Sequence, residues 1–151
     1  MLGNDIVDLN LAKTQSNWRR KRYLDKIFTT EEQLIISHAE NPDLMVWVLW
    51  SMKESAYKID NRKTGIRNFA PQSLSCTIHD NHHGEVNING NTYFTKSNLQ
   101  TAFVHTIAAS HHHELEKVEI TIYEAPHHLF DYKSIKPACV SHHGKYLALI
   151  Y

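Results

Sequence analysis

The sequence has few of the features that mark secreted, membrane and nucleic-acid-binding proteins. Two cysteines, Cys76 and Cys139, are too few for a disulfide framework, so reduced thiols are expected. No apolar stretch is long enough to span a membrane, and the first residues lack a signal-peptide pattern. Sixteen basic and sixteen acidic residues cancel, so the net charge predicts neither a nucleic-acid nor a membrane partner. We therefore expect a single cytoplasmic domain formed by residues 1–151.

One long helix is expected over residues 42–60. Asn41 can cap this helix, Pro42 can occupy its first turn, and residues 44–50 are apolar almost without interruption. A helix that is apolar all round lies in a core. Charged residues near its C-terminal end are therefore unexpected and require an explanation.

Shorter helices are expected before the long helix, and strands after it. Residues 16–27 read as a helix capped by Ser16, and residues 29–38 read as a helix with a Thr29–Glu32 capping box. From Leu74 onward, apolar and polar residues alternate, which predicts short strands. Turns are expected at His83-Gly84 and Asn89-Gly90-Asn91, strands at residues 101–108, 118–123 and 140–151, and irregular structure at residues 126–137. The pattern predicts an α+β fold, with early helices packed on an antiparallel sheet.

Lys53, Glu54 and Lys58 are the charged residues of the long helix that call for an explanation. Glu54 and Lys58 are four residues apart and share a helix face, whereas Lys53 is about 100° away in projection. A surface salt bridge on the last turn is the ordinary interpretation of a single Glu/Lys pair. The order Lys-Glu, followed four residues later by Lys and preceded by a Trp-rich run, is less common and indicates a functional cluster.

The N-terminal residues 1–9, MLGNDIVDL, read as a short strand that carries Asp5 and Asp8. Alone, such an acid is more often a turn residue than a metal ligand. Together, however, Gly-x-Asp-Ile-Val-Asp and the Trp-x-x-Lys-Glu-Ser-x-x-Lys motif of residues 50–58 resemble the 4′-phosphopantetheinyl transferases. The spacing, and the TGIRN segment of residues 64–68, are similar to the holo-acyl-carrier-protein synthase branch.

The resemblance implies an enzyme that transfers the phosphopantetheine arm of coenzyme A to a serine of an acyl or peptidyl carrier protein, releasing 3′,5′-ADP. It implies Mg²⁺ held by Asp5 and Glu54, since magnesium commonly takes one or two protein carboxylates. Val7 stands where the surfactin-type branch has a third acid, so water is expected there. Asp8 is left out, because it points away from Asp5 in a regular strand. Glu54 is the candidate general base, acting directly or through a metal-bound water.

The same resemblance assigns residues around coenzyme A. Lys53 and Lys58 match the family's lysines at the diphosphate, where they would bind the developing phosphate charge. Ser55 is either a hydroxyl contact or a small helix-packing residue. Thr64 and Gly65 match the turn beside the pocket, although Gly65 is equally well explained as a helix C-cap.

The C-terminal segment VSHHGKYLA resembles the family's Ser-His strand, which holds the 3′-phosphate of coenzyme A. Ser141 and His142 match this motif, and Ser110-His111 is a rival placement. In the synthase branch the site lies between subunits of a trimer, so the resemblance implies that Ser141 and His142 complete a neighbour's site in a homo-oligomer. The poorly matching residues 69–135 place both this contact and the trimer in question.

Arg19, Arg22 and Lys26 gather on one side of the expected helix 16–27 and are candidate contacts to an acidic carrier protein. An ordinary solvated helix face explains them equally well. Twelve histidines, including His82-His83, His111-His112-His113, His127-His128 and His142-His143, lack the Cys partners and spacing of a zinc site. Solvated loop residues are the preferred interpretation of the histidine clusters, with His142 the exception. The alternatives to the enzyme are a non-catalytic coenzyme A-binding or interaction module and a histidine-rich metal-binding protein.

Overall fold

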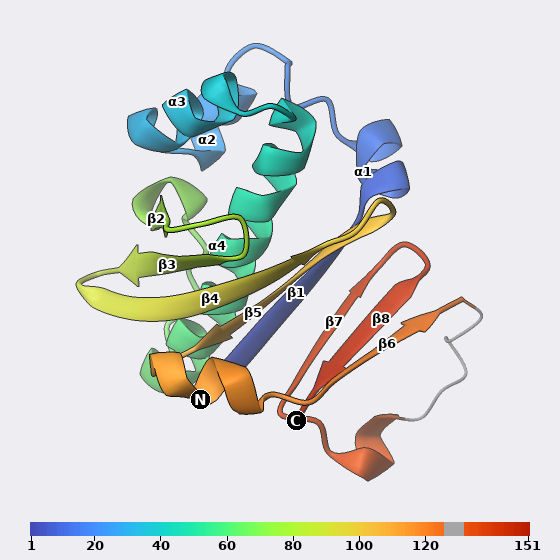
Figure 1. The fold of residues 1–151 in the computed structure, drawn as a ribbon. Coiled ribbons are helices and arrows are strands. Elements are labelled where there is room, and N and C mark those ends of the chain that lie inside the picture. Colours follow the sequence, from blue (N-terminus) through green and yellow to red (C-terminus); the bar gives the residue numbers. More distant parts are fainter. Residues whose placement is uncertain (126–131) are drawn as a thin grey trace.

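The computed structural model describes residues 1–125 and 132–151, which form two antiparallel sheets and several helices (Figure 1). The larger sheet has the order β1-β5-β4-β3-β2, and the smaller has the order β6-β8-β7. The strands are β1 (Leu2–Asp8), β2 (Ser75–Ile78), β3 (His83–Ile88), β4 (Asn91–Leu99), β5 (Phe103–Ala109), β6 (Ile120–Glu124), β7 (Cys139–His143) and β8 (Tyr146–Ile150). The helices are α1 (Leu9–Gln15), α2 (Tyr23–Ile27), α3 (Thr30–His38) and α4 (Pro42–Thr64), with 3₁₀ turns η1 (Pro71–Ser73), η2 (His112–Lys117) and η3 (Tyr132–Ile135). The predicted α+β class is confirmed.

Helix α4 begins as the sequence predicts and packs across one face of the larger sheet (Figure 1). The Asn41 side chain accepts a hydrogen bond from the backbone N–H of Leu44, and Pro42 lies in the first turn. The helix continues one turn beyond the predicted end. It stops where Gly65 adopts the left-handed conformation and donates its N–H to the carbonyl of Asn61.

The alternation of side chains along β1 decides which of its residues face α4. Val7 packs in the core beneath α4, so Asp5 and Gly3, at two-residue intervals, share this face. A Cβ atom on Gly3 would lie only 2.1 Å from the carbonyl oxygen of Ser55. Glycine at this position therefore lets α4 approach β1 closely, which brings Asp5 beside the second half of the helix.

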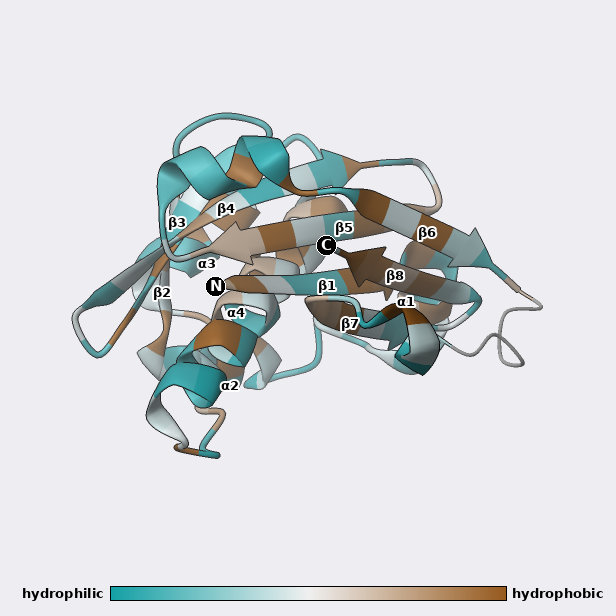
Figure 2. Ribbon diagram, turned by 90° about the horizontal axis from the view of Figure 1, so that it is seen from below, coloured by the Kyte–Doolittle hydropathy of each residue, from teal (hydrophilic) through white to brown (hydrophobic). Residues whose placement is uncertain are grey.

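The smaller sheet covers the opposite face of β1. Ile6 packs in one cluster with Tyr146 and Ala148, and the side-chain amide of Asn4 donates to the carbonyl of Ala148 at 3.2 Å. Every residue of β8 is buried, and Figure 2 shows most of this strand in the brown of hydrophobic residues. Strand β1 is thus enclosed between α4 and the smaller sheet.

Strand β7 lies beside the free edge of β1. The backbone N–H of Ile6 donates to Ser141 Oγ at 3.0 Å, and that of Asp8 donates to His143 Nδ1 at 2.8 Å. Asp8 itself caps α1 through Oδ1 and accepts the N–H of Lys145 through Oδ2. Side chains of the smaller sheet therefore satisfy backbone groups that an edge strand otherwise leaves unpaired.

The predicted helix over residues 16–27 is largely wrong. Only residues 23–27 are helical, and Ser16 is the C-cap of α1, a helix that the sequence interpretation missed. Arg22 has a φ of 69°, a conformation that interrupts a right-handed helix. The second early helix, α3, is confirmed together with its Thr29–Glu32 capping box.

The turns and strands of the second half follow the prediction with two exceptions. Asn89-Gly90 forms the expected hairpin turn, with positive φ at both residues. His83-Gly84 lies inside β3 and is not a turn, because the chain reverses just before it. Residues 140–151 hold two strands, since the chain turns at Gly144. The predicted irregular segment includes residues 126–131, with His127 and His128, which lie outside the described residues.

Within the described ranges, no helix combines the length and apolar character needed to cross a bilayer.

Candidate functional site

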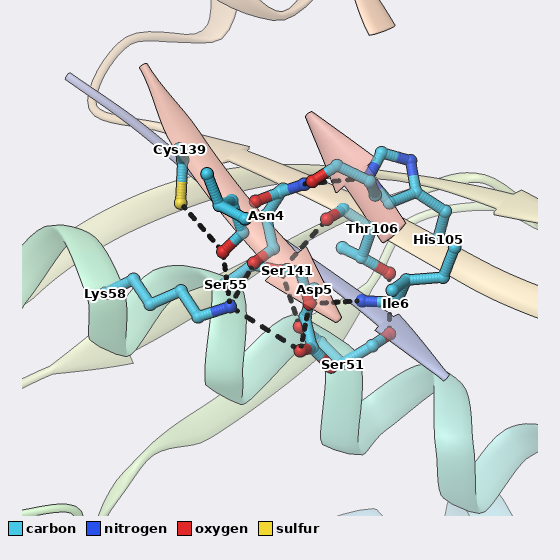
Figure 3. A network of polar contacts seen from close by, with 12 residues as sticks. Asn4, Asp5, Ile6, Ser51, Ser55, Lys58, His105, Thr106, Cys139 and Ser141 are labelled. Carbon is cyan, nitrogen blue, oxygen red and sulfur yellow. Dashed lines mark hydrogen bonds and ion pairs between the residues drawn. The ribbon is translucent and has the colours of Figure 1, made fainter. Parts of the chain in front are cut away.

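Asp5, Glu54 and Lys58 line one cavity of about 430 Å³. Asp5 comes from β1, and the other two residues lie on successive turns of α4. The Nζ atom of Lys58 lies 3.7 Å from Asp5 Oδ1 and donates to the carbonyl of Asn4 at 2.6 Å (Figure 3). The structure therefore brings together the three residues that the two sequence motifs singled out.

The two carboxylates occupy a poorly solvated, electrostatically strained position. Burial raises the pKa of Asp5 to about 7; Lys58 opposes this effect and the neighbouring Glu54 adds to it. Burial also raises the pKa of Glu54, again opposed by Lys58. Two carboxylates held this way are suited to bind a cation, and the raised pKa of each favours proton uptake.

Ser141 and His142 line the same cavity, whereas Ser110 and His111 do not. Ser141 Oγ donates a hydrogen bond to Asp5 Oδ1 at 3.0 Å (Figure 3). The Ser141-His142 placement is therefore the one that the structure brings to the predicted site. Within a single chain, Ser141 reaches Asp5 of that same chain.

Lys53 lies on a different face of α4 and does not line the cavity, so the structure does not bring it together with Asp5, Glu54 and Lys58. Its ammonium group forms an ion pair with Glu32 at 2.7 Å, and both side chains are completely buried. It also donates to the carbonyls of Ile27, Pro71 and Leu74 at 2.7–2.8 Å. Every donor of the ammonium group is occupied, and Lys53 is a structural residue that ties α4 to the chain around it.

Ser55, Thr64 and Gly65 also lie away from the cavity. The hydroxyl of Ser55 is buried and lies within hydrogen-bond distance of the backbone carbonyls of Ser51 and Thr106, so Ser55 is the helix-packing residue of the two alternatives. The hydroxyl of Thr64 donates to a backbone carbonyl one turn earlier in α4. Gly65 is the C-cap of the helix, and the predicted contacts of these residues with coenzyme A are not supported in one chain.

The three candidate carrier contacts are exposed but do not share a helix face. Arg19 forms an ion pair with Asp43 at 2.8 Å, Arg22 precedes α2, and Lys26 lies in the last turn of α2. Segment 17–22, which is exposed except for the half-buried Trp18, runs between Ser16 and Tyr23, and both of these residues line the cavity. This basic loop therefore flanks the site.

The residues that line the cavity but that sequence reasoning missed include Ser16, Tyr23, Trp50 and His143. Trp50 could have been found, because it lies four residues before Glu54 on the same helix face. Ser16 and Tyr23 carry no such signal, since they reach the cavity only through the path of the chain between α1 and α2. A larger cavity of about 710 Å³ shares Ser16 and Trp47 with the site.

The donor set fits a magnesium ion. Asp5 and Glu54 supply carboxylate oxygens at one cavity, and burial disfavours their charged forms, which a nearby cation would stabilise. Magnesium usually takes one or two protein carboxylates and fills its other positions with water and phosphate oxygens. Across residues 1–125 and 132–151, no three His, Cys, Asp or Glu side chains gather as a metal cluster. The described histidine clusters thus form no site of that kind.

The fold and this cavity define an α+β protein with two carboxylates and a lysine at one site. The family model of the 4′-phosphopantetheinyl transferase superfamily matches residues 1–117, and the chain belongs to this superfamily. Among solved structures, the fold is similar to that of Helicobacter pylori holo-[acyl-carrier-protein] synthase in complex with coenzyme A, with a TM-score of 0.57 and 11% identity. That similarity covers 72% of this chain and 98% of the other. No curated protein matches in sequence.

Proposed function

We propose that this chain transfers the 4′-phosphopantetheine arm of coenzyme A to a serine of an acyl or peptidyl carrier protein. The observation that carries the proposal is the meeting of Asp5, Glu54 and Lys58 at one cavity in a member of this superfamily. The similar fold of a synthase solved with coenzyme A supports coenzyme A as the co-substrate.

Asp5 and Glu54 are the residues that would hold Mg²⁺. A bound magnesium ion supplies positive charge that offsets the negative charge of the diphosphate. Without a cation, the two carboxylates would repel a phosphate-bearing substrate. Binding of the substrate would therefore depend on binding of the cation by Asp5 and Glu54.

In the transfer, the serine oxygen of the carrier forms a bond to the phosphorus that bears the pantetheine arm. The bond from that phosphorus to the 3′,5′-ADP oxygen breaks, and 3′,5′-ADP leaves. Lys58 would stabilise the charge that grows on the leaving phosphate, and its contacts to Asn4 and Asp5 hold its ammonium group in place. Glu54, whose pKa is raised by burial, is the candidate to accept the serine proton.

The carrier protein would approach over the segment 17–22. This loop contains Arg19 and Arg22, and its two neighbours, Ser16 and Tyr23, line the cavity. Complementary charge between this loop and an acidic carrier would orient the serine toward the site. The adjoining cavity of about 710 Å³ gives room for the pantetheine arm.

The direct test is intact-mass spectrometry of apo carrier proteins incubated with the chain, coenzyme A and magnesium, with an EDTA control. We expect a gain equal to the mass of the phosphopantetheine arm, lost with EDTA. Glu54→Gln should remain folded and lose about two orders of magnitude in rate or more, because it removes a ligand and a base. The exposed control Glu40→Gln should match the wild type.

A non-catalytic coenzyme A-binding module is the competing function, and the same experiment separates it. Coenzyme A binding by calorimetry without mass gain on any carrier of a panel would favour the module. Unchanged transfer by Glu54→Gln would show that the assigned site is wrong.

A further inference from the structure

The smaller sheet lies beyond the part of the chain that matches the family. The match ends at residue 117, and the sheet begins with Ile120 in β6. Its strand β7 nevertheless occupies the edge of β1, the strand that carries Asp5. This edge of β1 is therefore covered within the chain and is not available to a neighbouring copy.

The attachment of the smaller sheet to β1 is close and specific. At the turn between β7 and β8, Gly144 has a φ of 56°, and a Cβ atom there would lie 2.3 Å from Asp8 Oδ2. The same carboxylate accepts the N–H of Lys145, and the Asp8 N–H donates to His143. The second aspartate of the N-terminal motif thus fixes the C-terminal hairpin against β1.

Ser141 is the residue through which this attachment reaches the candidate site. Its hydroxyl oxygen accepts the Ile6 N–H at 3.0 Å, and its hydroxyl proton is donated to Asp5 Oδ1 at 3.0 Å. Ser141 is only 5% exposed. A serine hydroxyl has one proton to donate, so Ser141 cannot simultaneously donate to Asp5 and to a phosphate.

We propose that Ser141 is a positioning residue that holds the Asp5 carboxylate within the same chain, so that the smaller sheet completes the site without a neighbouring subunit. This inference rests on the function proposed above. Lys58 approaches the same carboxylate oxygen, at 3.7 Å, so Ser141 and Lys58 together fix the direction in which Asp5 faces the cavity.

The positioning role is tested with Ser141→Ala and Ser141→Thr, with the exposed Ser75→Ala as the control. Loss of the hydroxyl should reduce transfer about 10- to 100-fold and raise the magnesium concentration for half-maximal activity, as is usual for residues that orient a ligand. Ser141→Thr keeps the hydroxyl and should restore most of the activity. Full activity in Ser141→Ala, or equal losses in both variants, would overturn the role.

Calorimetry without carrier protein distinguishes positioning from a contact to the 3′-phosphate. Coenzyme A and dephospho-coenzyme A, which lacks that phosphate, are each titrated into wild type and Ser141→Ala. A positioning role predicts that the affinity ratio of the two ligands is the same in both proteins. A ratio that falls toward one in Ser141→Ala would assign Ser141 to the 3′-phosphate and overturn the proposal.

Completion within one chain is tested by co-expressing Glu54→Gln and Ser141→Ala chains with different tags. If sites were shared between subunits, some mixed assemblies would contain an intact Glu54 and an intact Ser141 at one site, and activity would rise above that of either variant alone. We expect no such gain. A gain would overturn the proposal.

If the wild-type chain shows no transfer activity, the proposed function is wrong, but the contact between Ser141 and Asp5 can still be tested by a double-mutant cycle. Unfolding free energies of wild type, Asp5→Asn, Ser141→Ala and the double variant are measured in urea. Contact between the two residues predicts non-additive effects that do not depend on protein concentration. Additive effects, or a coupling that disappears on dilution, would overturn the proposal.

Discussion

Lys53 and Lys58 lie five residues apart on the same helix, yet they have opposite surroundings. Lys53 is paired with Glu32 at 2.7 Å with both side chains fully buried, and backbone carbonyls take its other donors. Lys58 lies 3.7 Å from Asp5 at the wall of a cavity, and its side chain is 29% exposed. A charge that is completely paired in the core contributes to the fold, whereas a charge at a cavity can serve a ligand. Two lysines of one motif therefore have different tasks.

The largest expected effect is on stability, at the buried lysine. Lys53→Met should lower the free energy of unfolding by about 3–5 kcal/mol, because it leaves the carboxylate of Glu32 buried without its partner. Urea unfolding followed by circular dichroism measures this loss. The exposed Lys63→Met on the same helix is the control and should change stability by less than about 0.5 kcal/mol. A loss as small as that of the control would mean that the two lysines do not differ as described.

Replacing Lys58 at the cavity is expected to affect activity, and the corresponding change in activation free energy is smaller than the stability loss at Lys53. Lys58→Met should slow transfer about 100-fold, because it removes the charge that faces the leaving phosphate. Its unfolding free energy should fall less than that of Lys53→Met, since Lys58 is partly solvated. The mass-spectrometric assay and urea unfolding of the same preparations give both numbers. If Lys58→Met unfolds as readily as Lys53→Met while its folded fraction transfers normally, the division of tasks is wrong.

A pH dependence of stability is also expected at the Lys58–Asp5 pair. Folding raises the pKa of Asp5 from 3.8 to about 7, mainly through burial, so folding disfavours its charged form. The contribution of Asp5 to stability is therefore fully present below pH 4 and is lost as the pH rises through about 7. Relative to Asp5→Asn, wild type should lose stability between pH 4 and 7 in urea unfolding with EDTA. Parallel stability curves for the two proteins would contradict the raised pKa.

Local sequence was a good guide where the structure is set by neighbouring residues. The Asn41 cap, the Thr29–Glu32 capping box and the Asn89-Gly90 turn are each formed by residues within a few positions, and all three were predicted. The predicted helix over residues 16–27 is largely wrong, because Arg22 has a left-handed backbone conformation that the local sequence does not predict.

The site divides in the same way. Glu54 and Lys58 are four residues apart on one helix, so their shared face follows from helix geometry alone. The sequence also placed Lys53 about 100° from Glu54 around the helix. It did not show which part of the structure each of these two helix faces would contact. That depended on Glu32, which lies on another helix and pairs with Lys53. The motif was therefore correct as a family signature and wrong as a list of residues at the cavity.

The sequence by itself determined the α+β class, the central helix and the carboxylates and lysine of the candidate site. These follow from hydrophobic periodicity, capping and helical spacing, which act over a few residues. Only the tertiary structure decided that Ser141 meets Asp5, 136 positions away. It also decided that Lys53 is buried with Glu32, and that β7 closes the edge of β1. Such contacts depend on how whole elements pack, because packing joins residues whose separation in the chain carries no periodic signal.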